Sequence, residues 1–323
     1  MLVTGLLALV VASRTGLTGL LSGGIHLGPR VASAAPPARP RTPAPSGAAA
    51  SAPFATGWLR GHPQPALPID GHADALVDVD AHQVLWQRSM HASRAPASLA
   101  KLVTAMAAAD LAPLDREVTV TAQTDADAAR RVEPESTVMG LSAGEVLTVR
   151  ELMYGLFLRS GNDAAETLGS GIVSRDQFVQ RMNQKAAALH MGDSHFTTPV
   201  GLDDAGMRTS AYDLAVAAAT IATRYPALLA ISGAPSATIP QTAAHKSFDL
   251  VNYNKLVIPG NQYTYQGATG MKTAFTDDAG PCMVATASRG GRRLVAVVLD
   301  STNFFADATR LLDYGYSVSP ASR

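Results

Sequence analysis

The sequence contains a single cysteine, Cys282, so no disulfide can form within one chain. It has no excess of charge of either sign, because 26 basic residues balance 26 acidic ones. Aromatic residues make up only 6% of the chain, and no basic tract is interleaved with them. These absences argue against nucleic acid as a partner. No internal repeat is visible.

The first 34 residues resemble an export segment. Residues 2–12 form an apolar run, and Ala32-Ser33-Ala34 resembles a signal cleavage site. No basic residue precedes Arg14, so an uncleaved membrane anchor over about the first 24 residues is the alternative to a cleaved signal peptide. In either case we expect the protein to be exported to the cell envelope, outside the cytoplasm.

Residues 35–66 are rich in proline and alanine and have few large apolar side chains. Such a segment cannot form a core, so we expect a disordered linker there. A single domain is expected over residues 67–318. The chain is 47% hydrophobic, and strand and helix patterns follow one another through this range. Residues 319–323 form a short polar tail.

Within this domain the hydrophobic pattern alternates between strand and helix periods. We expect strands at residues 75–80, 83–89, 117–122, 245–257, 267–276, 282–290 and 292–301. Helices are expected at 98–108, 147–158, 163–172, 175–190, 210–231 and 305–316. This order predicts an α+β (mixed α/β) fold, with an antiparallel sheet flanked by helices.

Three short motifs follow one another in this framework. Ser98-Leu99-Ala100-Lys101 begins a helix, Ser160-Gly161-Asn162 interrupts one, and Lys272-Thr273-Ala274 lies on a late strand. Helical residues three apart share a face at about 5–6 Å between Cβ atoms, so Ser98 and Lys101 are expected to meet. Each motif alone also has an ordinary explanation, as a helix start, a helix end or an exposed strand face.

In this order the motifs resemble those of the penicillin-binding protein and serine β-lactamase superfamily. The sequence is most similar to its D-alanyl-D-alanine carboxypeptidase branch, peptidase family S11. Four further stretches carry the resemblance over about residues 70–317: LFLRSGNDAAETL, FTTPVGLDDAGMRTSAYDLA, TDDAGPCMVATA and FADATRLLDYGY. The resemblance implies a transpeptidase-like fold and a penicillin-binding serine peptidase that removes the terminal D-alanine of peptidoglycan stem peptides. It implies no metal and no other cofactor.

The resemblance also implies a role for each motif residue. Ser98 would be the nucleophile, Lys101 its base and Ser160 a proton relay, since a serine hydroxyl needs a base to attack a carbonyl carbon. The residues expected to bind the substrate are Asn162, Lys272, Thr273 and Phe275. The backbone N–H groups of Ser98 and Phe275 would form the oxyanion hole.

Two positions depart from the family pattern. Ala274 stands where the family usually has glycine, and its methyl group is expected to crowd the strand that approaches the substrate. Phe304 aligns with an arginine that lies close to the substrate carboxylate in many carboxypeptidases. Both changes are expected to affect binding of the terminal D-alanine.

Three alternatives remain. A β-lactamase needs a deacylating glutamate, but between the second motif and Pro199 only Glu166 is present, inside a helix and too close to Asn162. A degenerate homologue that binds peptidoglycan without turnover would account for the two departures. A metal site at His72, Asp78, Asp80 and His82 is disfavoured, since these residues alternate along a strand and its turn.

Overall fold

The computed structural model describes residues 53–122, 124 and 137–318. The expected signal or anchor segment, most of the linker and the polar tail lie outside the described residues. Regular structure begins before residue 67, where the sequence predicted the start of the domain. Phe54 is buried, and Gly57–Gly61 forms the short helix α1, so residues 53–66 are not the disordered linker that composition suggested.

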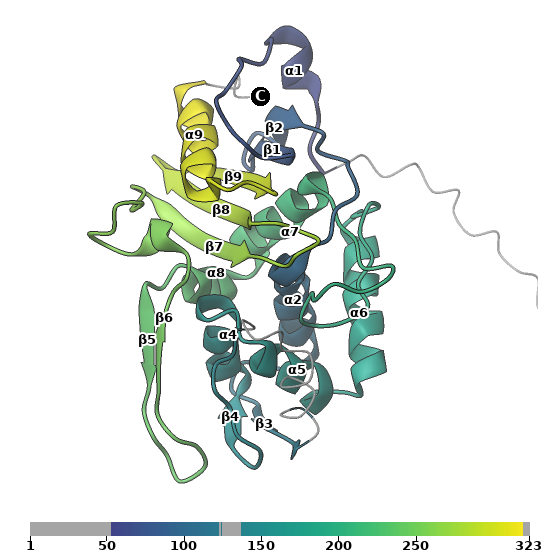
Figure 1. Ribbon diagram of the computed structural model, residues 1–323, viewed down its shortest axis with the longest axis vertical. Helices are drawn as coiled ribbons and strands as arrows, with labels where there is room; N and C mark the ends of the chain where they lie inside the picture. Colours follow the sequence, from purple (N-terminus) through teal and green to yellow (C-terminus); the bar gives the residue numbers. More distant parts are fainter. Residues whose placement is uncertain (1–52, 123, 125–136, 319–323) are drawn as a thin grey trace, which may run out of the picture. The chain divides into compact units, whose positions relative to one another are not determined.

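A five-stranded sheet forms the upper part of the structure as drawn in Figure 1. Its order is β2 (Gln83–Arg88), β1 (Ala73–Asp78), β9 (Arg292–Leu299), β8 (Cys282–Arg289) and β7 (Ala268–Ala274). All neighbouring strands pair antiparallel. The predicted antiparallel sheet is therefore confirmed, with β7 at its edge in the described part of the chain.

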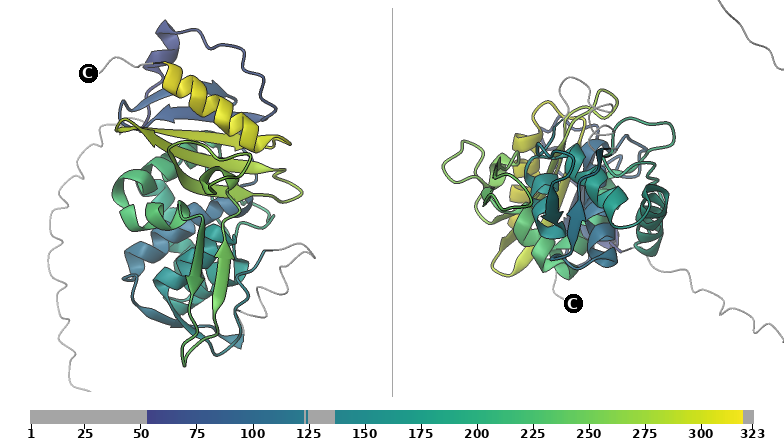
Figure 2. Two further views of the ribbon diagram at one scale, coloured as in Figure 1. Left: turned by 90° about the vertical axis from the view of Figure 1, so that its left-hand side faces the viewer. Right: turned by 90° about the horizontal axis from the view of Figure 1, so that it is seen from below.

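The alternation of side chains along β8 and β9 divides the core into two clusters. Val284, Val295 and Val297 face the helical part of the molecule. Met283 and Val298 point to the opposite face, where they pack against the closing helix α9 (Phe304–Ser317). Figure 2 shows α9 lying across this outer face of the sheet.

The helical part lies against the inner face of the sheet (Figures 1 and 2). It contains α2 (Lys101–Leu111), α4 (Val149–Leu158), α5 (Asn162–Gly171), α6 (Arg175–Ala188), α7 (Ala211–Arg224) and α8 (Pro226–Ser232). Two small hairpins accompany it: β3 (Glu117–Thr119) with β4 (Val146–Thr148), and β5 (Ser236–Ile239) with β6 (Phe248–Val251). Two short 3₁₀ helices are η1 (Ala97–Ala100) and η2 (Lys255–Val257).

The single helix expected over residues 210–231 is wrong. The chain bends by 111° between α7 and α8, because Pro226 cannot continue the helix at Tyr225. Among the described residues no single helix has both the length and the apolar character to cross a membrane, and only this bent pair satisfies the two criteria together. Most of α7 is buried in the core.

Candidate active site

The first motif lies where η1 passes into α2. Pro96 precedes η1, and Ala97 has a positive φ of 45°, a conformation that few non-glycine residues adopt. Ser98 follows, half-buried, and Lys101 begins α2 one turn later. The Nζ atom of Lys101 lies 2.8 Å from Oγ of Ser98, so the predicted meeting of these two side chains is confirmed.

Lys101 has no exposed surface. Besides the Ser98 hydroxyl, its Nζ contacts Oδ1 of Asn162 at 2.7 Å and the carbonyl oxygen of Val200 at 2.9 Å. Burial lowers the pKa of Lys101 from 10.5 to about 7, although the carboxylates of Asp163 and Glu166 oppose this shift.

These three contacts suit the ammonium form of Lys101, because Nζ can donate to Oγ of Ser98, to the amide oxygen and to the carbonyl oxygen at once. Burial favours the neutral form, in which two N–H groups can bind the amide and carbonyl oxygens while the lone pair is left for the Ser98 hydroxyl. An amine held in this way can take the serine proton, which is the chemistry of a general base.

The second motif is the interruption between α4 and α5. Ser160 has a positive φ of 57°, and Asn162 begins α5. The carboxylate of Asp163 accepts backbone N–H groups from Met139, Gly140 and Leu141 and thereby fixes this turn. Sequence reasoning missed Asp163, whose only signal was an acidic residue in the first turn of a helix.

The third motif brings Lys272 into the same buried cluster from β7. Its Nζ donates hydrogen bonds to Oγ of Ser160 at 2.8 Å and to the carbonyl oxygen of Thr273 at 2.7 Å. Burial lowers the pKa of Lys272 well below its usual value, and the nearby Lys101 lowers it further. The structure therefore brings together Ser98, Lys101, Ser160, Asn162 and Lys272.

Thr273 and Phe275 adjoin this cluster along the chain. Thr273 pairs with Met283 and Ala274 with Cys282 in the ladder between β7 and β8. Phe275 is the first residue after β7, and 57% of it is exposed. The substrate-binding roles of Thr273 and Phe275 remain predictions.

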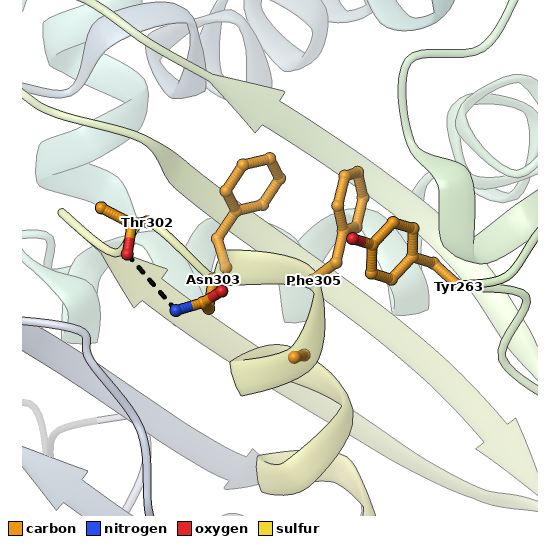
Figure 3. A pocket seen from close by; sticks show the side chains of 6 residues that line it. Tyr263, Thr302, Asn303 and Phe305 are labelled. Carbon is orange, nitrogen blue, oxygen red and sulfur yellow. Dashed lines mark hydrogen bonds between the residues drawn. The ribbon is translucent and has the colours of Figure 1, made fainter.

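Phe304 lies in different surroundings. Its ring centroid is 4.4 Å from that of Phe305, which in turn stacks on Tyr263 at 4.9 Å. These rings belong to the outer-face cluster and line a small pocket with Thr302 and Asn303 (Figure 3). Ala274, in contrast, packs against the inner-face cluster. The two departures from the family pattern thus contact different clusters.

Glu166, the one candidate for a deacylating base, is buried in α5. Arg175 donates to its two carboxylate oxygens at 2.9 and 3.1 Å. Cys282 is also buried, and burial raises the pKa of its thiol to about 12, as expected for a structural cysteine.

The residues weighed as metal ligands have other partners. Asp78 accepts N–H groups from Asp80 and Ala81 and pairs with Arg292, while Asp80 pairs with Arg293. Within the described ranges, no group of three or more His, Cys, Asp or Glu residues is arranged to hold a metal ion.

Comparison with known proteins gives consistent matches. Residues 61–303 match the family model described as D-alanyl-D-alanine carboxypeptidase. The chain is 36% identical over 276 residues to D-alanyl-D-alanine carboxypeptidase DacB2 of Mycobacterium tuberculosis, covering 81% of this chain and 90% of that protein.

Solved structures are similar over the same region. The crystal structure of a D-alanyl-D-alanine carboxypeptidase from Mycobacterium tuberculosis has a TM-score of 0.69 and 32% identity, covering 79% of this chain and 96% of that one. Penicillin-binding protein D2 from Listeria monocytogenes, in its ampicillin-bound form, has a TM-score of 0.66 and 27% identity, covering 78% and 100%.

Proposed function

Since this chain belongs to the D-alanyl-D-alanine carboxypeptidase family of serine peptidases, we propose that it cleaves the terminal D-alanine from peptidoglycan stem peptides through an acyl-enzyme at Ser98. The observation that carries this proposal is the contact between a buried lysine of lowered pKa and a half-buried serine. β-Lactams would react with the same serine as inhibitors.

In the first step Oγ of Ser98 attacks the carbonyl carbon of the penultimate residue. The hydroxyl proton passes to the neutral Nζ of Lys101 as the new C–O bond forms. The carbonyl oxygen becomes an oxyanion, which the backbone N–H groups of Ser98 and Phe275 stabilise. Thr273 binds the terminal carboxylate, and Asn162 binds a substrate amide while it orients Lys101.

In the second step the C–N bond to the terminal D-alanine breaks. Its amine takes a proton from Ser160. The proton that Lys101 took from Ser98 passes through Lys272 to restore the Ser160 hydroxyl, which leaves both lysines as they were before the reaction. The 2.8 Å contact between Lys272 and Ser160 supports this path. Water then hydrolyses the ester to regenerate Ser98. The pairing of Glu166 with Arg175 argues against a dedicated deacylating glutamate, so we expect β-lactam adducts to persist for minutes or longer.

A fluorescent penicillin tests the proposal. The purified protein should become labelled at Ser98, which mass spectrometry of the modified peptide identifies, and Ser98→Ala should abolish labelling. Ser317→Ala, at the exposed end of α9, is the matched control and should label normally. Rapid release of hydrolysed penicillin without a trapped adduct would favour a β-lactamase instead.

A second candidate is a homologue that binds peptidoglycan with little turnover. Ala274, in place of the usual glycine at the end of the edge strand, is the observation that favours it. Release of free D-alanine from a D-Ala-D-Ala tripeptide separates the two candidates, since the binding protein would acylate with penicillin and release none.

We also propose that the chain acts outside the cytoplasm. The apolar N-terminal residues and the envelope location of peptidoglycan support export, with residues 1–34 acting as a signal peptide or a membrane anchor. N-terminal sequencing of the protein from membrane and soluble fractions distinguishes these possibilities.

A further inference from the structure

The carboxylate of Asp203 connects the chain segment after Val200 with the loop that follows β7. After β7 the chain forms a loop over residues 275–281 before β8 begins. The Thr276 hydroxyl donates a hydrogen bond to Oδ1 of Asp203 at 2.7 Å, and the backbone N–H of Asp278 donates to Oδ2 at 3.1 Å. Each oxygen of the Asp203 carboxylate therefore binds a different part of this loop.

The segment that carries Asp203 is fixed to the helices that hold Ser98 and Lys101. The carbonyl oxygen of Val200 accepts the hydrogen bond from Lys101, and that of Pro199 accepts one from Thr104 in α2 at 2.7 Å. Gly201 has a φ of 86°, and a Cβ atom there would lie 1.9 Å from the carbonyl oxygen of Ala97. This close approach leaves the backbone next to Asp203 little freedom to move away from η1.

The loop itself is organised around Thr276. Its hydroxyl also accepts the N–H of Ala279 at 3.3 Å, and its carbonyl oxygen accepts the N–H of Gly280 at 3.0 Å. Phe275, directly before Thr276, is largely exposed and lies at the end of an edge strand. Apolar packing of its side chain therefore does little to fix its backbone, and the hydrogen bonds of Thr276 become important.

We propose that Asp203 is a positioning residue for the oxyanion hole, an inference that rests on the proposed acyl-transfer function. The two donors come from separate elements, Ser98 from η1 and Phe275 from the chain after β7. From a segment that packs against η1, the Asp203 carboxylate binds Thr276, the residue directly after Phe275. It thereby sets the separation of the two N–H groups. An oxyanion hole stabilises the transition state only if both donors are in place before the reaction.

The proposal predicts a specific kinetic effect. Loss of the Asp203 carboxylate should lower kcat for peptide hydrolysis and the acylation rate with penicillin by about tenfold or more, since misplacement of a reacting group by about 1 Å can cost about 10²-fold. KM for the peptide should change little. Binding of a peptide boronic acid, which forms a tetrahedral anionic adduct with a serine, should weaken in parallel with the acylation rate.

The experiment compares Asp203→Ala, Asp203→Asn, Thr276→Val and the Asp203→Ala/Thr276→Val double variant with wild type. Asp204→Ala is the matched control, because Asp204 is the exposed neighbouring acid. Acylation rates, boronic acid affinities and melting temperatures are measured for all. We expect Asp203→Asn to fall between wild type and Asp203→Ala, and the double variant to react nearly as fast as the slower single variant, since both changes break one connection. Thr276→Ser, which keeps the hydroxyl, should react like wild type.

An acylation rate and boronic acid affinity of wild-type size in Asp203→Ala would overturn the inference. The inference would also fail if Asp204→Ala lowered the acylation rate as much as Asp203→Ala does. It would fail likewise if Asp203→Ala lowered the rate and Thr276→Val did not. If Asp203→Ala does not fold, Thr276→Val and Thr276→Ser decide the question alone. Failure of wild type itself to be acylated would contradict the proposed function, which distinguishes that result from all of these.

Discussion

The Nζ atom of Lys101 lies 2.8 Å from Oγ of Ser98, yet the lysine is fully buried whereas the serine is only half-buried. The proposed base is thus kept from water while the proposed nucleophile remains partly accessible. Because desolvation favours the neutral amine, the same burial that costs folding energy prepares Lys101 to accept a proton.

Acylation should depend on pH through Lys101. The proposed base can take a proton only when neutral, so with the pKa of Lys101 near 7 the acylation rate should rise between about pH 6 and 8 and then level. Lys101→Ala should lower the rate by about 10²–10⁴-fold with a much smaller effect on melting temperature. Stopped-flow measurement with a fluorescent penicillin gives the acylation rates, and thermal unfolding gives the melting temperature. Lys246→Ala, at an exposed lysine, is the control. If Lys101→Ala reacts at the wild-type rate, Lys101 is not the base.

Ala274→Gly should raise kcat/KM for a D-Ala-D-Ala tripeptide. The methyl group of Ala274 lies at the end of the edge strand, where the substrate backbone is proposed to pass, and its removal relieves crowding. Release of free D-alanine measures the effect, which should reach up to about 10²-fold because rates are sensitive to about 1 Å in position. An unchanged rate would show that the methyl group does not limit the enzyme.

Phe304→Arg tests the second departure separately. If the position lies near the substrate carboxylate, the new guanidinium should lower KM for the tripeptide about tenfold, since a hydrogen bond to a charged group contributes about 1.5–3 kcal/mol. Phe304 now packs beside Phe305, so a modest fall in melting temperature should accompany the change. A variant that loses stability and gains no affinity would assign Phe304 to the outer-face cluster alone.

Asp74→Asn should stabilise the protein in a pH-dependent way. Asp74 is fully buried on β1, its oxygens lack hydrogen-bond partners of ordinary geometry among the described residues, and Arg88 is 3.9 Å away. Burial raises its pKa from 3.8 to about 7. Between these values the folded protein holds a proton that the unfolded chain has released, so stability falls as pH rises towards 7.

The asparagine variant lacks this titration. Its advantage in unfolding free energy over wild type should therefore grow from about pH 4 to pH 8, to at most about 4 kcal/mol for a shift of roughly three pKa units. Thermal unfolding at several pH values measures it. A difference that does not vary with pH would contradict the raised pKa.

The sequence was most informative where the relevant contacts are local. Ser98 and Lys101 share one helical turn, so their contact followed from spacing. Lys101 and Val200 are 99 residues apart and meet only in the folded chain, so the period of the apolar residues could not predict their contact. Asp163 was missed for the same reason, since its partners lie in a different segment of the chain. Pro226 indicates a break between α7 and α8, but the apolar pattern continues past it and favours a single helix.

The left-handed conformations of Ala97 and Ser160 have a consequence for how this protein loses function. Each costs about 1–3 kcal/mol relative to ordinary backbone geometry, and each persists only because the surrounding packing holds it. As urea weakens that packing, these two residues can relax while the sheet remains paired. Reactivity towards penicillin should then decline at lower urea concentrations than the circular dichroism signal, so activity measures the integrity of this fold more sensitively than its secondary structure does.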